Sequence, residues 1–363
     1  MAVPSSNIKV GLVMYRGEAA PSSSAGSSFY RYPYELYKRI RKLPDGIDVE
    51  KIESYVPFFG RGISLMFGMA LRDLGHYDII HNLDVAPIFP FKKGNTILVS
   101  TAHDFQFVLD REQNRTLRKR YRDLLWSEII LRMSLRSLLS SDYMIAVSSL
   151  TKKDAVKLGY KSDRIFVVNN GMDERFFSEF RAQRRGNGDF VVGYLGVFAP
   201  RKNVPFAIRA FNKITEGGYA FRIWGKKAYD YEIARKEAGG NDRIEFMGYA
   251  PDEKIVQIYD SFDAFVFPSG YEGFGIPIIE AQARGLPVII RKDSKIPDEV
   301  RKYCLEARDE SHMAQLIRDL KDNGYNEKLR KRAASYARGF TWQKNAEQTV
   351  RVYKTIMKRG ALA

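Results

Sequence analysis

The chain has 363 residues, which is long enough for two domains that each bury a hydrophobic core. Its 59 Lys and Arg outweigh its 43 Asp and Glu, and the net charge of +16 favours anionic partners such as nucleic acid, acidic lipid or a phosphorylated substrate. A single cysteine, Cys304, excludes an internal disulfide and a cysteine-based zinc cluster, and four histidines give little material for a dedicated metal site.

Membrane insertion and secretion are not expected from this sequence. The longest apolar runs fall short of the roughly 20 residues that span a bilayer. The first residues, MAVPSSNIKV, lack the positive charge and the apolar block of a signal peptide. We therefore expect a cytoplasmic protein.

Strands and helices alternate in the first half of the chain. A first apolar strand at 8–14 leads into a glycine- and serine-rich segment at 17–28, where an α/β domain carries an active-site loop, although a plain flexible connection is the alternative. An amphipathic helix follows at 29–40. Further strands are predicted at 78–81, 96–100, 143–147 and 165–168.

Two short patterns accompany these strands. His103 and Asp104 follow the strand at 96–100 and so lie at its carboxyl end, where parallel sheets bind their ligands. From the residues alone, a histidine that simply caps a loop or turn is the favoured interpretation of this position. Ser149 or Thr151 is expected to cap the helix that follows the strand at 143–147.

Two segments combine basic with aromatic or aliphatic residues. The segment 57–74 is expected to form a core helix, because stripes of aromatic residues and methionine are usually buried, and an interfacial role is the alternative. The segment 111–137 contains eight Lys or Arg against three Asp or Glu, a net charge of +5, and its apolar residues follow helical spacing. This basic segment is either a solvated helix face or a surface that docks on an anionic membrane, and the sequence supports both interpretations.

A charged link at 181–188 separates this half from a second series of strands that begins at 190–195. Arg201 and Lys202 follow that strand directly, and Asn203 is expected to cap a helix at 204–214. Cations before a helix N-terminus favour phosphate, although surface pairs of basic residues are common. Two alternating series with a link between them predict a pair of Rossmann-like domains that face a cleft.

The most informative stretch is AFVFPSGYEGFGIPIIEAQARGLPVII at 264–290. An apolar strand at 264–267 is followed by a loop with two glycines and by a helix that begins near Ile276 with Pro277 in its first turn. Gly285 ends the helix, and the next strand begins at Pro287. The N–H groups at the start of such a helix favour an anion.

Two glutamates flank this turn. Glu272 precedes the helix and Glu280 lies about one turn inside it, with seven residues between them. Carboxylates bind hydroxyl groups and backbone amides bind phosphate, so the pattern predicts a ligand that joins phosphate to polyols, which is a sugar nucleotide. Either glutamate alone is explained equally well as a solvent-exposed charge.

The string YEGFGIPIIEA, with the following GLPVI, closely resembles the donor-site signature of the retaining glycosyltransferases of the GT-B fold, family 4. The His-Asp pair, the PRKN string and the NNGMD string at the hinge are similar to that family as well, and the resemblance covers nearly the whole chain. Two departures stand out. Serines replace most glycines of the first loop, and Gly196 and Val197 stand where many members place an arginine.

The resemblance implies an α/β protein of GT-B architecture, with two doubly wound Rossmann-like domains. It implies that His103 lines the sugar, that Glu272 holds the sugar hydroxyls, and that Arg201 and Lys202 stabilise the departing phosphate. It further implies that Glu280 binds the ribose. The donor-binding set is completed by Gly196, Gly273, Phe274, Gly275 and Ile276.

The resemblance also implies the domain plan and the activity. An acceptor-binding domain is expected at 1–180, a donor-binding domain at 181–340, and a C-terminal helix at 341–363 that crosses back to the first domain. The expected reaction is retaining transfer of a hexose, mannosyl or glucosyl, from a nucleoside diphosphate sugar to a hydroxyl of a lipid-linked or glycan acceptor. No metal or other cofactor is expected, and a peripheral position on the inner face of the membrane is a further hypothesis.

Two rival functions follow from the same residues. A non-catalytic protein that senses a nucleotide sugar would need the same donor contacts. A nucleic-acid-binding protein would use the positive charge, but it would also need aromatic platforms or a recognisable helix motif among its basic residues, and neither is evident.

Overall fold

The computed structural model describes residues 7–15, 28–44, 46–54, 74–83, 95–105, 124–179 and 188–360 of the chain. The predicted first loop up to residue 27, most of the segment 57–74, residues 111–123 of the basic segment and most of the link at 181–188 lie outside these ranges.

The chain divides into two compact units. Among the described residues, the first unit contains 7–15, those between Phe29 and Gly171, and those from Trp342 onward, and the second contains those between Met172 and Thr341. The predicted boundary lay at 180–181, but Met172 already donates its N–H to the carbonyl of Phe340 (3.0 Å). The stretch after Met172 therefore packs with the second unit, and the last helix, α14 (Trp342–Gly360), belongs to the first unit.

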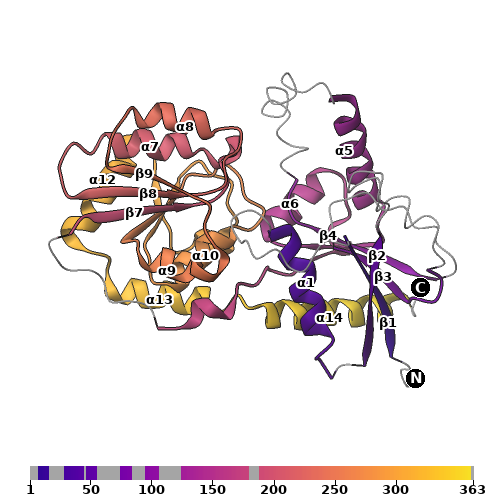
Figure 1. Ribbon diagram of the computed structural model, residues 1–363. Helices are drawn as coiled ribbons and strands as arrows, with labels where there is room; N and C mark the ends of the chain where they lie inside the picture. The colour runs from indigo at the N-terminus through magenta and orange to yellow at the C-terminus, as the bar shows by residue number, and fades with distance from the viewer. Residues whose placement is uncertain are drawn as a thin grey trace. The chain divides into compact units, whose positions relative to one another are not determined.

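A parallel sheet with the order β2-β1-β3-β4-β5-β6 forms the first unit. The strands are β1 (Ile8–Tyr15), β2 (Ile47–Ser54), β3 (Ile79–Asn82), β4 (Ile97–Ala102), β5 (Tyr143–Ala146) and β6 (Ile165–Val167). The described helices are α1 (Ser28–Ile40), α5 (Leu124–Leu139), α6 (Ser149–Lys157), the short η1 (Ser162–Arg164) and α14. Apolar residues of α1 and α14 pack with the middle strands in one core. Figure 1 shows the two helices next to each other.

The second unit is built on a parallel sheet with the order β12-β11-β10-β7-β8-β9. Its strands are β7 (Phe190–Leu195), β8 (Tyr219–Trp224), β9 (Ile244–Gly248), β10 (Ala264–Phe267), β11 (Val288–Arg291) and β12 (Leu305–Ala307). The α-helices are α7 (Val204–Asn212), α8 (Tyr231–Ala238), α9 (Ile255–Asp260), α10 (Ile276–Ala283), α11 (Asp298–Arg301), α12 (Glu310–Asn323) and α13 (Glu327–Ala337). The short helices are η2 (Glu174–Phe177), η3 (Pro200–Lys202) and η4 (Asp252–Lys254).

Helices cover both faces of this second sheet. In Figure 1, α7, α8 and α12 lie on one face, and α9, α10 and α13 lie on the other. The central strands β7, β10 and β11 are buried on both sides, so they are nearly continuous apolar runs such as AFVF in β10. This doubly wound α/β architecture is the predicted fold class.

The structure corrects two predicted helix caps. The cap of α6 is Ser148, whose Oγ accepts the N–H of Thr151 at 3.0 Å, and not Ser149 or Thr151. Asn203 does precede α7, but its backbone is left-handed (φ 46°) and its side chain makes no capping hydrogen bond. The short helix η3, which holds Arg201 and Lys202, ends on this residue and turns the chain into α7.

Candidate functional site

The strand order of the second sheet locates a binding site before any side chain is considered. β7 lies between β8 and β10, so the chain adds strands first on one side of β7 and then on the other. At such a switch point the loops after the two central strands diverge and leave a crevice beyond their carboxyl ends. Here the two loops are 196–203 after β7 and 268–275 after β10.

Backbone hydrogen bonds tie these loops together. The N–H of Gly270 donates to the carbonyl of Arg201 at 2.8 Å, and the N–H of Glu272 donates to the carbonyl of Lys295 at 2.9 Å. Lys295 in turn donates its own N–H to the carbonyl of Gly270 at 2.8 Å. The side chains on the two loops are therefore held in a fixed relation, as a site that must be preorganised requires.

Glu272 and the two predicted cations meet at this crevice. Glu272 Oε1 lies 2.5 Å from Lys202 Nζ and 3.0 Å from Arg201 Nη1. Burial would raise the pKa of the Glu272 carboxyl, but the charges of Lys202 and Arg201 outweigh it and lower that pKa to about 2. The carboxylate is therefore ionised at neutral pH although only 6% of the residue is exposed.

Lys202 is the more enclosed of the two cations. It is 8% exposed, and its ammonium lies 5.0 Å from the centre of the Phe267 ring at the end of β10. The Arg201 side chain keeps 29% of its surface exposed. One buried cation and one partly exposed cation thus contact the same carboxylate.

Glu280 lies inside α10 and is 6% exposed. Its Oε2 accepts a hydrogen bond from the hydroxyl of Tyr259 at 2.9 Å, and Tyr259 belongs to α9. Burial and the nearby Glu280 raise the pKa of Tyr259, so the hydroxyl remains a donor. The solvent-exposed alternative considered for Glu272 and for Glu280 is therefore wrong for both.

The start of α10 depends on glycine. Gly275 precedes the helix with φ 98°, in a region where a side chain would be strained, and Pro277 follows in the first turn. The first N–H groups of a helix have no carbonyl partner inside it, so this end favours an anion. The Phe274 side chain is buried at 5.6 Å from the Phe340 ring, which leaves only its backbone as a donor-binding group.

Gly196 has a packing role that the sequence did not indicate. Its N–H donates to the carbonyl of Trp224 at 3.0 Å, and a Cβ on Gly225 would lie 1.9 Å from the carbonyl oxygen of Gly196. The loops after β7 and β8 therefore touch backbone to backbone. The Gly196 N–H is already bonded to the Trp224 carbonyl, and a contact of Gly196 with the donor stays a prediction.

His103 belongs to the first unit and stands just after β4. It is 7% exposed, and its Nε2 lies 3.2 Å from the carbonyl oxygen of Leu83, which follows β3. A carbonyl only accepts, so Nε2 carries a proton and donates it to Leu83. The structure thus groups Glu272, Arg201, Lys202, Glu280, Gly196 and the start of α10 in one unit, and His103 in the other.

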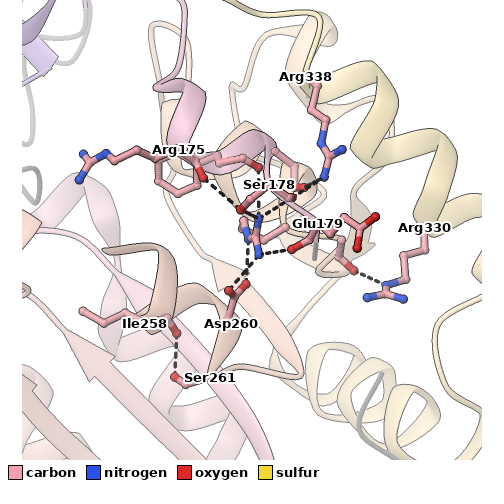
Figure 2. A network of polar contacts seen from close by, with 12 residues as sticks. Arg175, Ser178, Glu179, Ile258, Asp260, Ser261, Arg330 and Arg338 are labelled. Carbon is pink, nitrogen blue, oxygen red and sulfur yellow. Dashed lines mark hydrogen bonds and ion pairs between the residues drawn. The ribbon is translucent and has the colours of Figure 1, made fainter. Parts of the chain in front are cut away.

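Three residues that support the site in the second unit are not indicated by any local sequence pattern. Tyr259 and Lys295 contact the site only through tertiary packing. The third is Arg284, whose guanidinium binds both carboxylate oxygens of Asp260 (2.8 and 2.9 Å) and the carbonyls of Ser178 (2.8 Å) and Glu179 (3.0 Å). Figure 2 shows this network, in which Arg338 also reaches Ser178. It fixes the end of α10 to α9 and to the chain segment that enters the unit.

Two further observations apply to the described residues. No group of three or more His, Cys, Asp or Glu side chains within them is placed to hold a metal ion. None of the helices found in the described ranges combines the length and the apolar character needed to cross a membrane.

Comparison with known proteins agrees with this architecture. Residues 176–340 match the family model of the glycosyl transferases group 1, and residues 31–176 match the model of Glycosyltransferase Family 4. The O-antigen chain mannosyltransferase B of Escherichia coli is 27% identical over 306 residues, which cover 79% of this chain and 76% of that protein.

Two solved structures are similar in fold. Sucrose-phosphate synthase from Thermosynechococcus elongatus has a TM-score of 0.72 at 18% identity, over 97% of this chain and 100% of that chain. The Anabaena protein HepE, in complex with UDP-glucose, has a TM-score of 0.64 at 16% identity, over 96% and 100%. The chain belongs to the group 1 glycosyltransferases of the GT-B fold.

Proposed function

We propose that the protein transfers a hexose from a nucleoside diphosphate sugar to an acceptor hydroxyl, with retention of the anomeric configuration. The observation that carries this proposal is the buried cluster of Glu272, Arg201 and Lys202 at the switch point of the second sheet. A carboxylate for hydroxyl groups and two cations for phosphate stand next to each other there, as a sugar bound to a diphosphate requires.

Each side chain has a definite task in this proposal. Arg201 and Lys202 bind the diphosphate and stabilise the charge that develops as the bond to the anomeric carbon breaks. Glu272 accepts hydrogen bonds from the sugar hydroxyls and also holds both cations in place. Glu280, oriented by Tyr259, accepts hydrogen bonds from the ribose hydroxyls.

The proposed chemistry follows from these positions. The acceptor oxygen attacks the anomeric carbon on the face that the diphosphate leaves, the leaving group takes the electron pair of the broken bond, and its phosphate oxygen takes the acceptor proton. This route gives retention without a covalent intermediate. Because Arg201 and Lys202 supply the positive charge, we propose that a divalent metal is not required.

The sugar and the acceptor are proposed from the relatives. The E. coli relative is named as a mannosyltransferase of the O-antigen chain, and the Anabaena structure holds UDP-glucose. A mannosyl or glucosyl donor and a glycan or lipid-linked acceptor are consistent with both names. The net charge of +16 supports binding of the protein to an anionic membrane surface that presents a lipid-linked acceptor.

Thermal stabilisation by a panel of nucleotide sugars, followed by an assay for nucleoside diphosphate release, tests the proposal. A donor that raises the melting temperature and is slowly hydrolysed, and then consumed faster with an acceptor, is the expected result. A non-catalytic sensor is the second candidate, because the described donor contacts lie within one unit and would serve binding alone. Stabilisation without any release of nucleoside diphosphate would favour that sensor.

A further inference from the structure

Two contacts orient the His103 ring in the first unit. The hydrogen bond from Nε2 to the Leu83 carbonyl holds one corner of the imidazole. The Tyr32 ring packs edge to face against the same imidazole, with the centroids 4.9 Å apart and the planes at 88°. The Tyr32 ring therefore restricts where the imidazole points.

Tyr32 is itself held from two sides. It is 1% exposed and lies on α1, and its ring also packs edge to face on Trp342, with the centroids 5.9 Å apart. Trp342 is the first residue of α14 and follows directly on Thr341, the last residue of the second unit. One buried ring thus contacts both His103 and the beginning of the helix that returns to the first unit.

A chain of polar groups continues from Tyr32 to the middle of α14. The Tyr32 hydroxyl lies 3.4 Å from Thr101 Oγ1, which lies 2.8 Å from His81 Nε2, and His81 Nδ1 lies 2.6 Å from the hydroxyl of Tyr353. Burial, and then the charge of His103, lowers the pKa of His81 to about 3, so this histidine is neutral and relays hydrogen bonds. His81, Thr101 and Tyr353 are fully buried.

We propose that Tyr32 is a positioning residue for His103, and that through Tyr32 the orientation of this imidazole depends on the packing of α14. The proposal rests on the proposed function in one respect, namely that His103 faces the sugar during transfer. The Tyr32 ring acts on His103 by packing, and the Tyr32 hydroxyl acts through Thr101 and His81 on Tyr353.

Kinetics of the full chain provide the first test. Tyr32→Leu removes the ring and should lower turnover by up to about 100-fold, the usual scale for a catalytic group displaced by about 1 Å, with nucleotide affinity unchanged. Tyr32→Phe keeps the ring and should retain most of the turnover. Tyr34, on the same helix but 40% exposed, provides the matched control, and Tyr34→Leu should behave as the wild type.

A double-mutant cycle separates positioning from a general loss of stability. In a His103→Ala background, Tyr32→Leu should cause no further loss of turnover, because the group that it positions is already absent. Equal losses in both backgrounds would overturn the positioning role, as would a Tyr32→Leu variant with wild-type turnover.

NMR of the histidine ring nitrogens tests whether Tyr32 orients the His103 imidazole, and this test does not require an active enzyme. The chain has four histidines, so labelled imidazoles can be assigned by single substitutions. The His103 signals should report a proton on Nε2, and they should shift in Tyr32→Leu and, by a smaller amount, in Tyr353→Phe. Unchanged His103 signals in both variants would overturn the coupling. If the wild type transfers no sugar, the proposed function fails, and these spectra still decide the role of Tyr32.

Discussion

Lys202 Nζ lies 2.5 Å from Glu272 Oε1 although 70 positions separate the two residues in the chain. The loops after β7 and β10 bring them together, and Arg201 contacts the same carboxylate oxygen. Because the ionised Glu272 pairs with both basic side chains and is buried together with Lys202, the cluster is electrostatically coupled, and changing one member changes the others.

Loss of either cation should affect catalysis more than binding. Arg201→Ala and Lys202→Ala should each lower turnover by roughly ten- to a thousandfold, the scale for losing one group aimed at developing charge. Turnover and the affinity for the nucleoside diphosphate are measured separately. Lys236→Ala, on the exposed side of α8, is the control. A loss confined to acceptor affinity would contradict the assignment.

Glu280 should control nucleotide affinity. Glu280→Gln replaces a charge-assisted hydrogen bond to the ribose by a neutral one, so affinity for the nucleoside diphosphate should fall by about tenfold. Tyr259→Phe keeps the carboxylate but removes its 2.9 Å donor, so it should have a smaller effect in the same direction. Calorimetric titration checks both variants. Unchanged affinity in a folded Glu280→Gln protein would exclude the ribose role.

The stability contributed by Glu272 should depend on pH. Its pKa is lowered from 4.5 to about 2, so its contribution is complete above pH 4.5 and is lost as the pH falls towards 2. Glu272→Gln leaves two cations without their carboxylate and should lower the free energy of unfolding by about 3 kcal/mol at pH 7.

Denaturant unfolding between pH 7 and pH 2 checks this prediction. The difference between the wild type and Glu272→Gln should narrow as the pH falls below 4.5. Glu232→Gln, an exposed position in the first turn of α8, should show no such trend. A constant difference down to pH 2 would mean that the ion pair does not stabilise the fold.

The contact between Gly196 and Gly225 should tolerate no side chain. Gly225→Ala places a methyl group 1.9 Å from the Gly196 carbonyl oxygen, so the free energy of unfolding should fall by about 1–3 kcal/mol. Gly217→Ala is the matched control, because no atom lies within 4 Å of the added carbon. Comparable stability of the two variants would show that the loops can separate without cost.

Binding to an anionic membrane remains a prediction from the sequence, because residues 111–123 lie outside the described ranges. Sedimentation with vesicles should require anionic lipid, weaken with added salt, and weaken again when Arg118, Lys119 and Arg120 become Ser. Equal binding to neutral vesicles, or no binding to anionic ones at low salt, would leave the charge without this role.

The sequence predicted the central strands better than the edges of the sheets. β7 and β10 have the predicted bounds, because a strand buried on both faces is a continuous apolar run. β2 and β12 were not predicted. Both are edge strands, and their charged or short sequences, IDVEKIES and LEA, form strands only because a neighbour pairs with them.

The candidate site likewise contains residues that the sequence predicted and residues that it did not predict. Glu272, Glu280 and the glycine turn before α10 lie in one continuous stretch, so their spacing could be recognised. Tyr259, the Arg284 network and the relay from Tyr32 to Tyr353 join residues that are distant in the chain. Such contacts depend on tertiary packing, and no local pattern specifies them.

Proton NMR of the transfer reaction shows whether the anomeric configuration of the sugar is retained. The full chain is incubated with the nucleotide sugar that it hydrolyses and an acceptor, and the anomeric signals of donor and first-formed product are followed with time. An α-linked donor should give an α-linked product, and Lys202→Ala should slow this conversion without changing the anomer. A β-linked first product, or a donor that binds and is never consumed, would contradict it.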